Sequence, residues 1–90
     1  MGPNYAAVSA CASSSHAMGN AFDIIRCGKA DVMVTGGSEA GITIPSIGGF
    51  NSAQALSTRN DDYLTASRPF DKNRDGFVMG EGSGLSLIHI

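Results

Sequence analysis

A segment with helical periodicity, bounded on both sides by a short apolar run, constrains the fold more than any other feature of this sequence. Residues Ala12–Arg26 predict a helix, because apolar side chains recur on one face of it. The positions on that face are Met18, Ala21, Phe22 and Ile25. Tyr5–Ser9 before the helix and the valine-rich run Ala30–Thr35 after it each predict a short buried strand. A strand, a helix and a strand in this order predict a βαβ unit with parallel strands, and therefore an α/β fold class.

One cysteine lies at the junction between the first predicted strand and the helix. Cys11 is close to the unpaired N–H groups of a helix start and to the positive end of the helix dipole, and both stabilise a nucleophilic thiolate. From this spacing alone two interpretations stay open: Cys11 is a catalytic nucleophile, or it is a small buried hydrophobic residue. His16 comes five residues later on the same helix, so its side chain points well away from that of Cys11. We expect a structural role for His16.

The second half of the chain has weaker periodicity. Gly41–Gly49 predicts a loop, and Phe50–Leu56 predicts a short helix. The polar stretch Ser57–Asp75 predicts a long irregular connection, which in a compact domain is usually functional. Phe77–Val78 and Leu85–Ile90 predict strand on either side of a glycine-rich bend.

Composition narrows the classes of function. The net charge is −2 with no basic tract, which argues against nucleic acid or an anionic membrane as a partner. No apolar run is long enough to span a membrane and the sequence begins without a signal-peptide pattern, so we expect a cytoplasmic protein. Only 16% of the residues are charged, which suggests that other parts of a protein bury much of this chain. Cys11 and Cys27 lie at opposite ends of the predicted helix, roughly 24 Å apart, so we expect two free thiols rather than a disulfide.

Two short motifs resemble ion-binding loops but lack residues that such loops need. Asp71–Gly76 matches the start of an EF-hand loop, but Gly82 stands where the bidentate glutamate is required. Gly80–Gly84 lacks the Gly-Lys-Ser/Thr ending of a phosphate loop. We therefore expect a tight charged turn in place of a calcium site. The side chains that we expect to pair in this turn are those of Asp71, Arg74 and Asp75.

Several blocks of the sequence share their order and spacing with one enzyme family. The blocks are Gly2–Asn4, Val8–Ser14, Ala30–Glu39, Gly48–Phe50, Ala55–Asn60, Ser67–Asp71 and Arg74–Gly82. Together they resemble the β-ketoacyl-acyl carrier protein synthases, and most closely the type that elongates fatty acids. Their order and spacing make the resemblance specific, which no single block would.

The resemblance implies a thiolase-like layered αβαβα fold, of which this chain is an internal piece of the N-terminal half. It implies a 3-oxoacyl-[acyl carrier protein] synthase, an acyltransferase that joins an acyl thioester to malonyl-acyl carrier protein by decarboxylating Claisen condensation. Cys11 would be the acyl-accepting nucleophile, its own N–H would help to bind the carbonyl oxygen, and Phe50 would line the acyl pocket. For Phe50 the alternative is a core phenylalanine at a helix start. The resemblance implies no metal and no cofactor, and it implies acyl carrier protein and a second copy of the enzyme as partners.

The same resemblance leaves three functional hypotheses open. The first is the fatty-acid synthase described above, the second is a ketosynthase domain of a polyketide synthase, and the third is a non-catalytic truncated fragment. The family uses two histidines from later motifs, and neither His16 nor His89 matches them. We therefore predict that the 90 residues alone do not catalyse condensation. Residues 1–84 are predicted to belong to the synthase domain, and residues 85–90 depart from the family pattern as a truncation or an unrelated tail.

Overall fold

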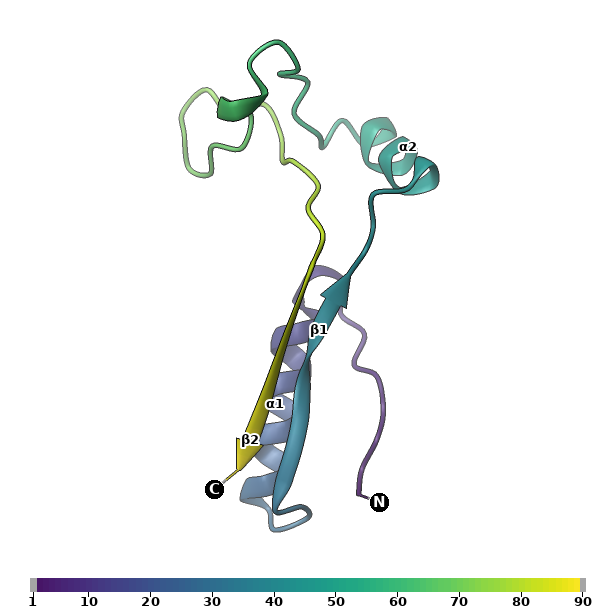
Figure 1. The fold of residues 1–90 in the computed structure, drawn as a ribbon, viewed down its shortest axis with the longest axis vertical. Coiled ribbons are helices and arrows are strands. Elements are labelled where there is room, and N and C mark those ends of the chain that lie inside the picture. Colours follow the sequence, from purple (N-terminus) through teal and green to yellow (C-terminus); the bar gives the residue numbers. More distant parts are fainter. Residues whose placement is uncertain (1, 90) are drawn as a thin grey trace. The chain divides into compact units, whose positions relative to one another are not determined.

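The computed structural model describes residues 2–89, which form two compact units. The first, here called the helix–sheet unit, comprises residues 2–39 and 82–89, and the second, the loop unit, is Ala40–Glu81. The elements along the chain are η1 (Ala10–Ala12), α1 (Ser13–Arg26), β1 (Val32–Glu39), α2 (Ile44–Ser52), η2 (Tyr63–Thr65) and β2 (Gly82–His89), with η marking 3-10 helices (Figure 1). Each unit is described separately below.

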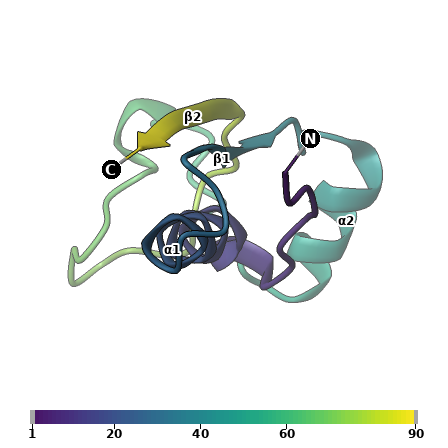
Figure 2. The ribbon, with the colours of Figure 1, turned by 90° about the horizontal axis from the view of Figure 1, so that it is seen from below.

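Helix α1 confirms the predicted helix to within one residue at its start. It ends in a Schellman motif: the Gly28 N–H donates to the Ile25 carbonyl and the Lys29 N–H donates to that of Ile24. Gly28 has φ +70°, which glycine adopts without the steric cost of a Cβ atom. Helix α1 lies along one face of the strand pair (Figures 1 and 2). Its buried contacts with that face come from Ala21 and Ile25, which are 2% and 7% exposed.

Strands β1 and β2 form an antiparallel pair, whereas the parallel pairing predicted between residues 5–9 and residues 30–35 is not found among residues 2–89. The register runs from Val32 opposite His89 to Glu39 opposite Gly82. The predicted strand Tyr5–Ser9 is also wrong: residues 2–9 are not in a strand, and Val8 is 85% exposed. A strand needs a neighbour that pairs with its N–H and C=O groups, and no described residue pairs with this segment in a ladder.

The core of the helix–sheet unit is small. Among residues 2–89 the buried residues of this unit are Ala21, Ile25 and Thr35. The opposite face of the strand pair is open, although its side chains are apolar. These side chains are Val32, Val34, Leu85 and Leu87, which are 52–72% exposed. The unit therefore buries one side of its sheet and leaves the other uncovered, in line with the low charge content of the sequence.

Helix α2 (Ile44–Ser52) begins within Gly41–Gly49, a stretch predicted to be a loop. It begins eight residues after Gly36 and ends at Ser52, so the predicted helix Phe50–Leu56 is displaced toward the C-terminus. Thr43 caps its start, since the Thr43 side chain accepts from the Ser46 N–H at 3.4 Å, and a proline stands in the first turn. The cap and the proline are the signals that mark this helix start, and the glycines of the segment obscured them.

The remainder of the loop unit is irregular, as predicted for Ser57–Asp75, with η2 as a single short turn. Phe77 forms an isolated parallel bridge with Leu56. The Phe77 N–H donates to the Ala55 carbonyl at 2.9 Å, and the Ser57 N–H donates to the Phe77 carbonyl at 2.9 Å. The bridge replaces the longer strand expected near Phe77 and ties the two ends of the irregular connection together. The predicted strand Leu85–Ile90 lies within β2 as far as His89, and residue 90 lies outside the described residues.

Candidate functional site

Cys11 is the central residue of the sharp turn that leads from the extended N-terminal segment into α1. It lies in η1 and its thiol is exposed. Ala10, immediately before it, has φ +52°, a left-handed conformation that is uncommon for a residue with a Cβ atom. The first hydrogen bond between backbone groups in this turn runs from the Ala12 N–H to the Ser9 carbonyl, at 3.1 Å. The Cys11 N–H therefore lies where backbone donors have no helical acceptor.

The hydroxyl of Ser13 connects two backbone groups of this turn. It accepts from the Ser9 N–H at 3.0 Å and donates to the Ala10 carbonyl at 2.7 Å. Ser9 forms a second hydrogen bond, between its own hydroxyl and Nδ1 of His16, at 3.2 Å. The hydrogen-bond partner of His16 is thus Ser9 rather than Cys11.

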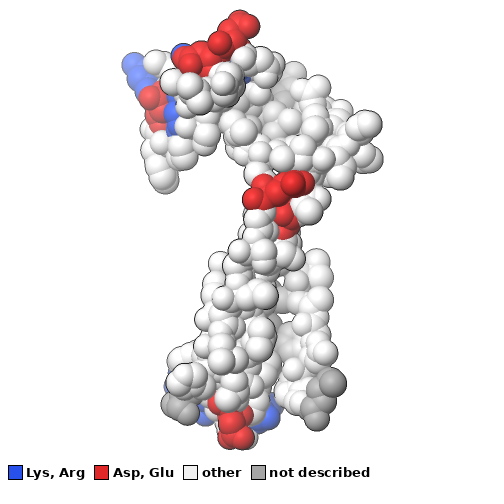
Figure 3. Space-filling model, in the orientation of Figure 1, with Lys and Arg blue, Asp and Glu red and all other residues white. Residues whose placement is uncertain are grey.

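The Cys11 turn forms one wall of an open pocket of about 690 Å³ within the helix–sheet unit. Alanine, serine and glycine make up most of the lining, and Glu39 is the charged residue among the lining residues described. Gly37 of β1 allows the strand to approach the start of α1, since a Cβ atom on Gly37 would collide with the Ser14 side chain. The charged residues that precede β1 in the sequence of this unit are Asp23, Arg26, Lys29 and Asp31. They lie in the last turns of α1 and in the connection to β1, and Figure 3 shows acidic and basic atoms together at that end of the unit. Glu39 is therefore the charged residue that lines the pocket beside the thiol.

Cys27 provides a contrast on the same helix. It is the residue that caps the C-terminal end of α1, and its thiol is also exposed. Both cysteines are free, which confirms the expectation that they do not form a disulfide. Cys27 is thus a natural internal reference for the reactivity of Cys11.

Phe50 belongs to the last turn of α2 in the loop unit, rather than to a helix start. Its ring packs edge to face against that of Phe77, with centroids 5.1 Å apart and planes at 85°. Phe50 is 42% exposed, so a substantial part of the ring remains available for contact. The pair anchors α2 on the segment that follows the irregular connection.

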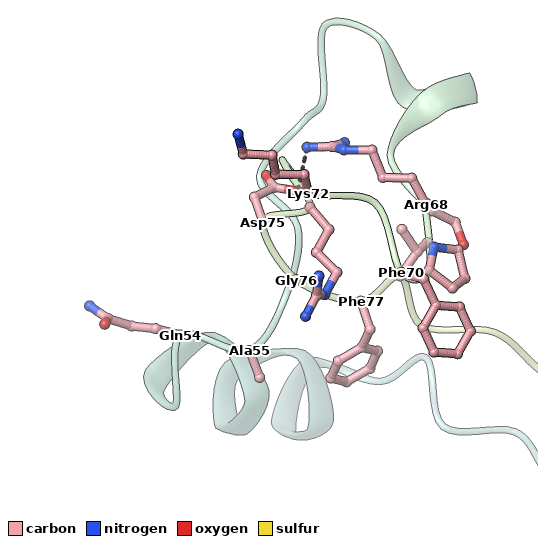
Figure 4. Close-up of a pocket in the computed structure, with 12 residues that line it drawn as sticks. Gln54, Ala55, Arg68, Phe70, Lys72, Asp75, Gly76 and Phe77 are labelled. Carbon is pink, nitrogen blue, oxygen red and sulfur yellow. Dashed lines mark hydrogen bonds and ion pairs between the residues drawn. The ribbon is translucent and has the colours of Figure 1, made fainter.

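Asp75 organises the charged turn of the loop unit. It accepts hydrogen bonds from the Ser57 hydroxyl at 2.7 Å and the Thr58 N–H at 3.1 Å, and the Arg68 guanidinium approaches it to 3.3 Å. The hydrogen bond from Ser57, followed by that from Thr58 and the charge of Arg68, holds the pKa of Asp75 below its usual range. Arg68 also donates to the carbonyl of Asn73, so one side chain spans the turn beside an open pocket of about 840 Å³ (Figure 4).

The pairing in this turn differs from the expected one. Arg74 donates to the backbone carbonyl of Asp71 instead of pairing with a carboxylate. The carboxylates of Asp71 and Asp75 both face the Arg68 guanidinium. Arg68 lies outside the turn whose own charges were expected to pair, so its role was not predicted. The signal was present in the sequence, as an arginine three residues before Asp71.

Comparison with known proteins identifies the family to which this chain belongs. The family model described as "Beta-ketoacyl synthase, N-terminal domain" matches residues 1–89. The chain belongs to the β-ketoacyl synthase family. This confirms the family inferred from the sequence blocks.

Two relatives of this β-ketoacyl synthase chain carry the same enzyme name. The chain is 60% identical over 87 residues to 3-oxoacyl-[acyl-carrier-protein] synthase 2 of Synechocystis sp., and 56% identical to the enzyme of the same name from Staphylococcus aureus. Each alignment covers 97% of this chain and 21% of the relative. The chain thus spans about a fifth of the length of the curated relatives that it matches.

Solved structures give the same family. A β-ketoacyl synthase from Burkholderia phymatum matches with a TM-score of 0.84 and 43% identity, over 90% of this chain and 20% of that protein. A type II polyketide ketosynthase, solved with its acyl-carrier protein and bound to the hexaketide, matches with a TM-score of 0.84 and 42% identity, over 88% of this chain and 20% of that protein. These neighbours confirm the thiolase-like α/β fold class, of which this chain forms an incomplete part. No helix among residues 2–89 is long and apolar enough to cross a bilayer.

Proposed function

We propose that this chain carries the nucleophile of a 3-oxoacyl-[acyl carrier protein] synthase of fatty acid biosynthesis, and that Cys11 is that nucleophile. The observation that carries the proposal is the Cys11 turn: an exposed thiol at a helix start, directly after a left-handed residue, with its own N–H outside the helical hydrogen bonds. The name shared by the Synechocystis and Staphylococcus relatives supports the choice of reaction.

Two chemical steps follow from this arrangement. In the first, the Cys11 thiolate attacks the carbonyl carbon of an acyl thioester on the carrier protein, the acyl C–S bond to the carrier breaks, and the carrier thiol leaves. The Cys11 N–H donates to the oxygen that becomes negative in this step. In the second, malonyl-carrier loses CO₂, the resulting carbanion attacks the Cys11 thioester, and the cysteine leaves as 3-oxoacyl-carrier forms.

The second step needs groups that the family resemblance locates elsewhere. Two histidines would assist decarboxylation, and neither His16 nor His89 of this chain matches their motifs. The 90 residues are therefore expected to accept an acyl group at Cys11 without completing the condensation. No metal and no cofactor is part of this scheme.

The remaining roles are part of the same proposal. Phe50 contributes its exposed ring surface to the acyl pocket, supported by its 42% exposure and its anchoring against Phe77. Acyl carrier protein is the partner that delivers the acyl and malonyl groups, supported by the neighbouring ketosynthase solved with its acyl-carrier protein. The enzyme acts as a cytoplasmic homodimer without nucleic acid or membrane partners.

A polyketide ketosynthase is the second candidate. The type II polyketide neighbour, at 42% identity and a TM-score of 0.84, favours it, because the same Cys11 chemistry serves both pathways. A non-catalytic fragment is the third candidate, supported by the small core of the helix–sheet unit. The acyl-transfer step distinguishes the third candidate from the first two.

The test compares the two cysteines of one molecule. The purified 90-residue chain is incubated with a small acyl thioester or with acyl-carrier protein, and acylation of each cysteine is located by peptide mass spectrometry. We expect acylation of Cys11, none in Cys11→Ala, and unchanged acylation in Cys27→Ser. Equal, slow acylation of Cys11 and Cys27 would show that Cys11 is an ordinary thiol and would reject the proposal. Formation of 3-oxoacyl product by this chain alone would contradict the assignment of condensation to residues elsewhere.

A further inference from the structure

We infer that Ser13 is the positioning residue of the nucleophile turn, an inference that rests on the proposed role of Cys11. Ser13 stands two residues after Cys11, at the first position of α1. Its hydroxyl bridges the Ser9 N–H and the Ala10 carbonyl, the backbone groups of the two residues that precede Cys11. One side chain thereby holds the backbone that leads into Cys11.

The turn requires such a bridge because its conformation is unfavourable on its own. Ala10 has φ +52°, and a left-handed alanine persists only where the surrounding contacts enforce it. The Ser13 N–H and the Ser13 hydroxyl both donate to the Ala10 carbonyl, which fixes the direction of that peptide group. Because the same peptide group includes the Cys11 nitrogen, the direction of the Cys11 N–H is fixed with it.

The bridge also satisfies a donor that the turn would otherwise leave unpaired. Ser9 precedes the helix, so its N–H has no helical acceptor, and the Ser13 hydroxyl accepts it at 3.0 Å. The hydrogen bond of His16 reaches the Ser9 side chain, at 3.2 Å, and not the carbonyl of Ala10. His16 therefore cannot replace Ser13 in holding the peptide that carries the Cys11 N–H.

This geometry separates two kinds of reactivity at Cys11. Acyl transfer develops negative charge on the carbonyl oxygen and benefits from an N–H held in a fixed direction. Alkylation by iodoacetamide displaces iodide from a saturated carbon and develops no such oxyanion. Loss of the Ser13 hydroxyl is therefore expected to slow acyl transfer much more than alkylation.

The experiment uses the 90-residue chain with three substitutions. Ser13→Ala removes the bridge, Ser13→Thr keeps the hydroxyl, and Ser14→Ala removes the neighbouring hydroxyl as a matched control. Both rates at Cys11 are measured relative to alkylation of Cys27 in the same molecule. We expect acyl transfer to fall about tenfold in Ser13→Ala with less than about threefold change in alkylation, because one preorganised oxyanion donor contributes roughly 100-fold or more. Ser13→Thr and Ser14→Ala should remain within about threefold of the parent chain.

The outcomes separate this inference from the proposed function. If the parent chain does not acylate Cys11, the proposed function fails. If the parent chain acylates Cys11 but Ser13→Ala does so equally fast, only the positioning role of Ser13 is wrong. An equal loss of acylation and alkylation in Ser13→Ala, or no rescue by Ser13→Thr, would indicate a general loss of structure and would also reject the positioning role.

Discussion

The small core of the helix–sheet unit makes one stability prediction unusually sharp, because packing and helix propensity act in opposite directions. Ile25 is 7% exposed where α1 packs on the strand pair. Ile25→Ala removes three buried carbons at about 0.8 kcal/mol each, a loss of roughly 2 kcal/mol before any cavity is counted. Alanine is the better helix former, by less than about 0.7 kcal/mol. Because a 14-residue helix is marginal without tertiary packing, we expect Ile25→Ala to lower the helix content of the chain.

The assay is the far-UV circular dichroism of the 90-residue chain, with hydrogen exchange of the α1 amides as a site-specific readout. Leu87→Ala is the matched control, since it also removes three carbons but from a side chain that is 62% exposed. Its cost should be under about 1 kcal/mol, and α1 should keep its protection. Unchanged or increased helicity in Ile25→Ala would mean that α1 forms by propensity alone, and the packing argument would then be refuted.

Three further predictions concern single contacts. Asp75 has a lowered pKa in the folded chain, so its stabilisation is present above about pH 4, the usual range for an aspartate, and is lost as the pH falls further. Protection of the Thr58 amide, relative to its intrinsic exchange rate at each pH, should therefore fall below about pH 4, and Asp75→Asn should remove that pH dependence; an identical pH profile in both would argue against the contact. Thr43→Ala should destabilise α2 by about 0.5–2 kcal/mol by hydrogen exchange, and Thr43→Ser should restore most of it; equal protection in both variants would exclude a capping role. Gly37→Ala should cost about 1–3 kcal/mol in urea unfolding, partly recovered when combined with Ser14→Ala, and strict additivity of the two changes would contradict the close approach.

Local signals in the sequence were sufficient for α1 and for the Cys11 turn. Apolar spacing predicted the helix, a glycine predicted its end, and the junction predicted where the cysteine would lie. Each of these depends on contacts within a few residues. The bridge from Ser13 is also local, but serine near a helix start is common and does not by itself indicate which backbone groups it will bind.

Helix α2 and the Asp75 turn were harder to predict. Two glycines inside α2 lowered its apparent helix propensity, although the Thr43 cap and the proline that follows it outweigh them in the structure. In the Asp75 turn, several cations were within reach of the carboxylate. The course of the backbone brings Arg68 close to Asp75, and the spacing of the charges in the sequence does not predict that course.

The amino-acid sequence by itself determined the family, the helix after Cys11 and the position of that cysteine at the helix start, since all three depend on local patterns and ordered motifs. The tertiary structure alone decided that β1 pairs with β2 in antiparallel order and that the segment before Cys11 is not in a strand. The physical reason is that strand pairing depends on which distant segment supplies the complementary backbone groups, and periodicity cannot identify that segment. The left-handed conformation of Ala10 was not predicted either, because a residue with a Cβ atom adopts it only where several contacts enforce it together.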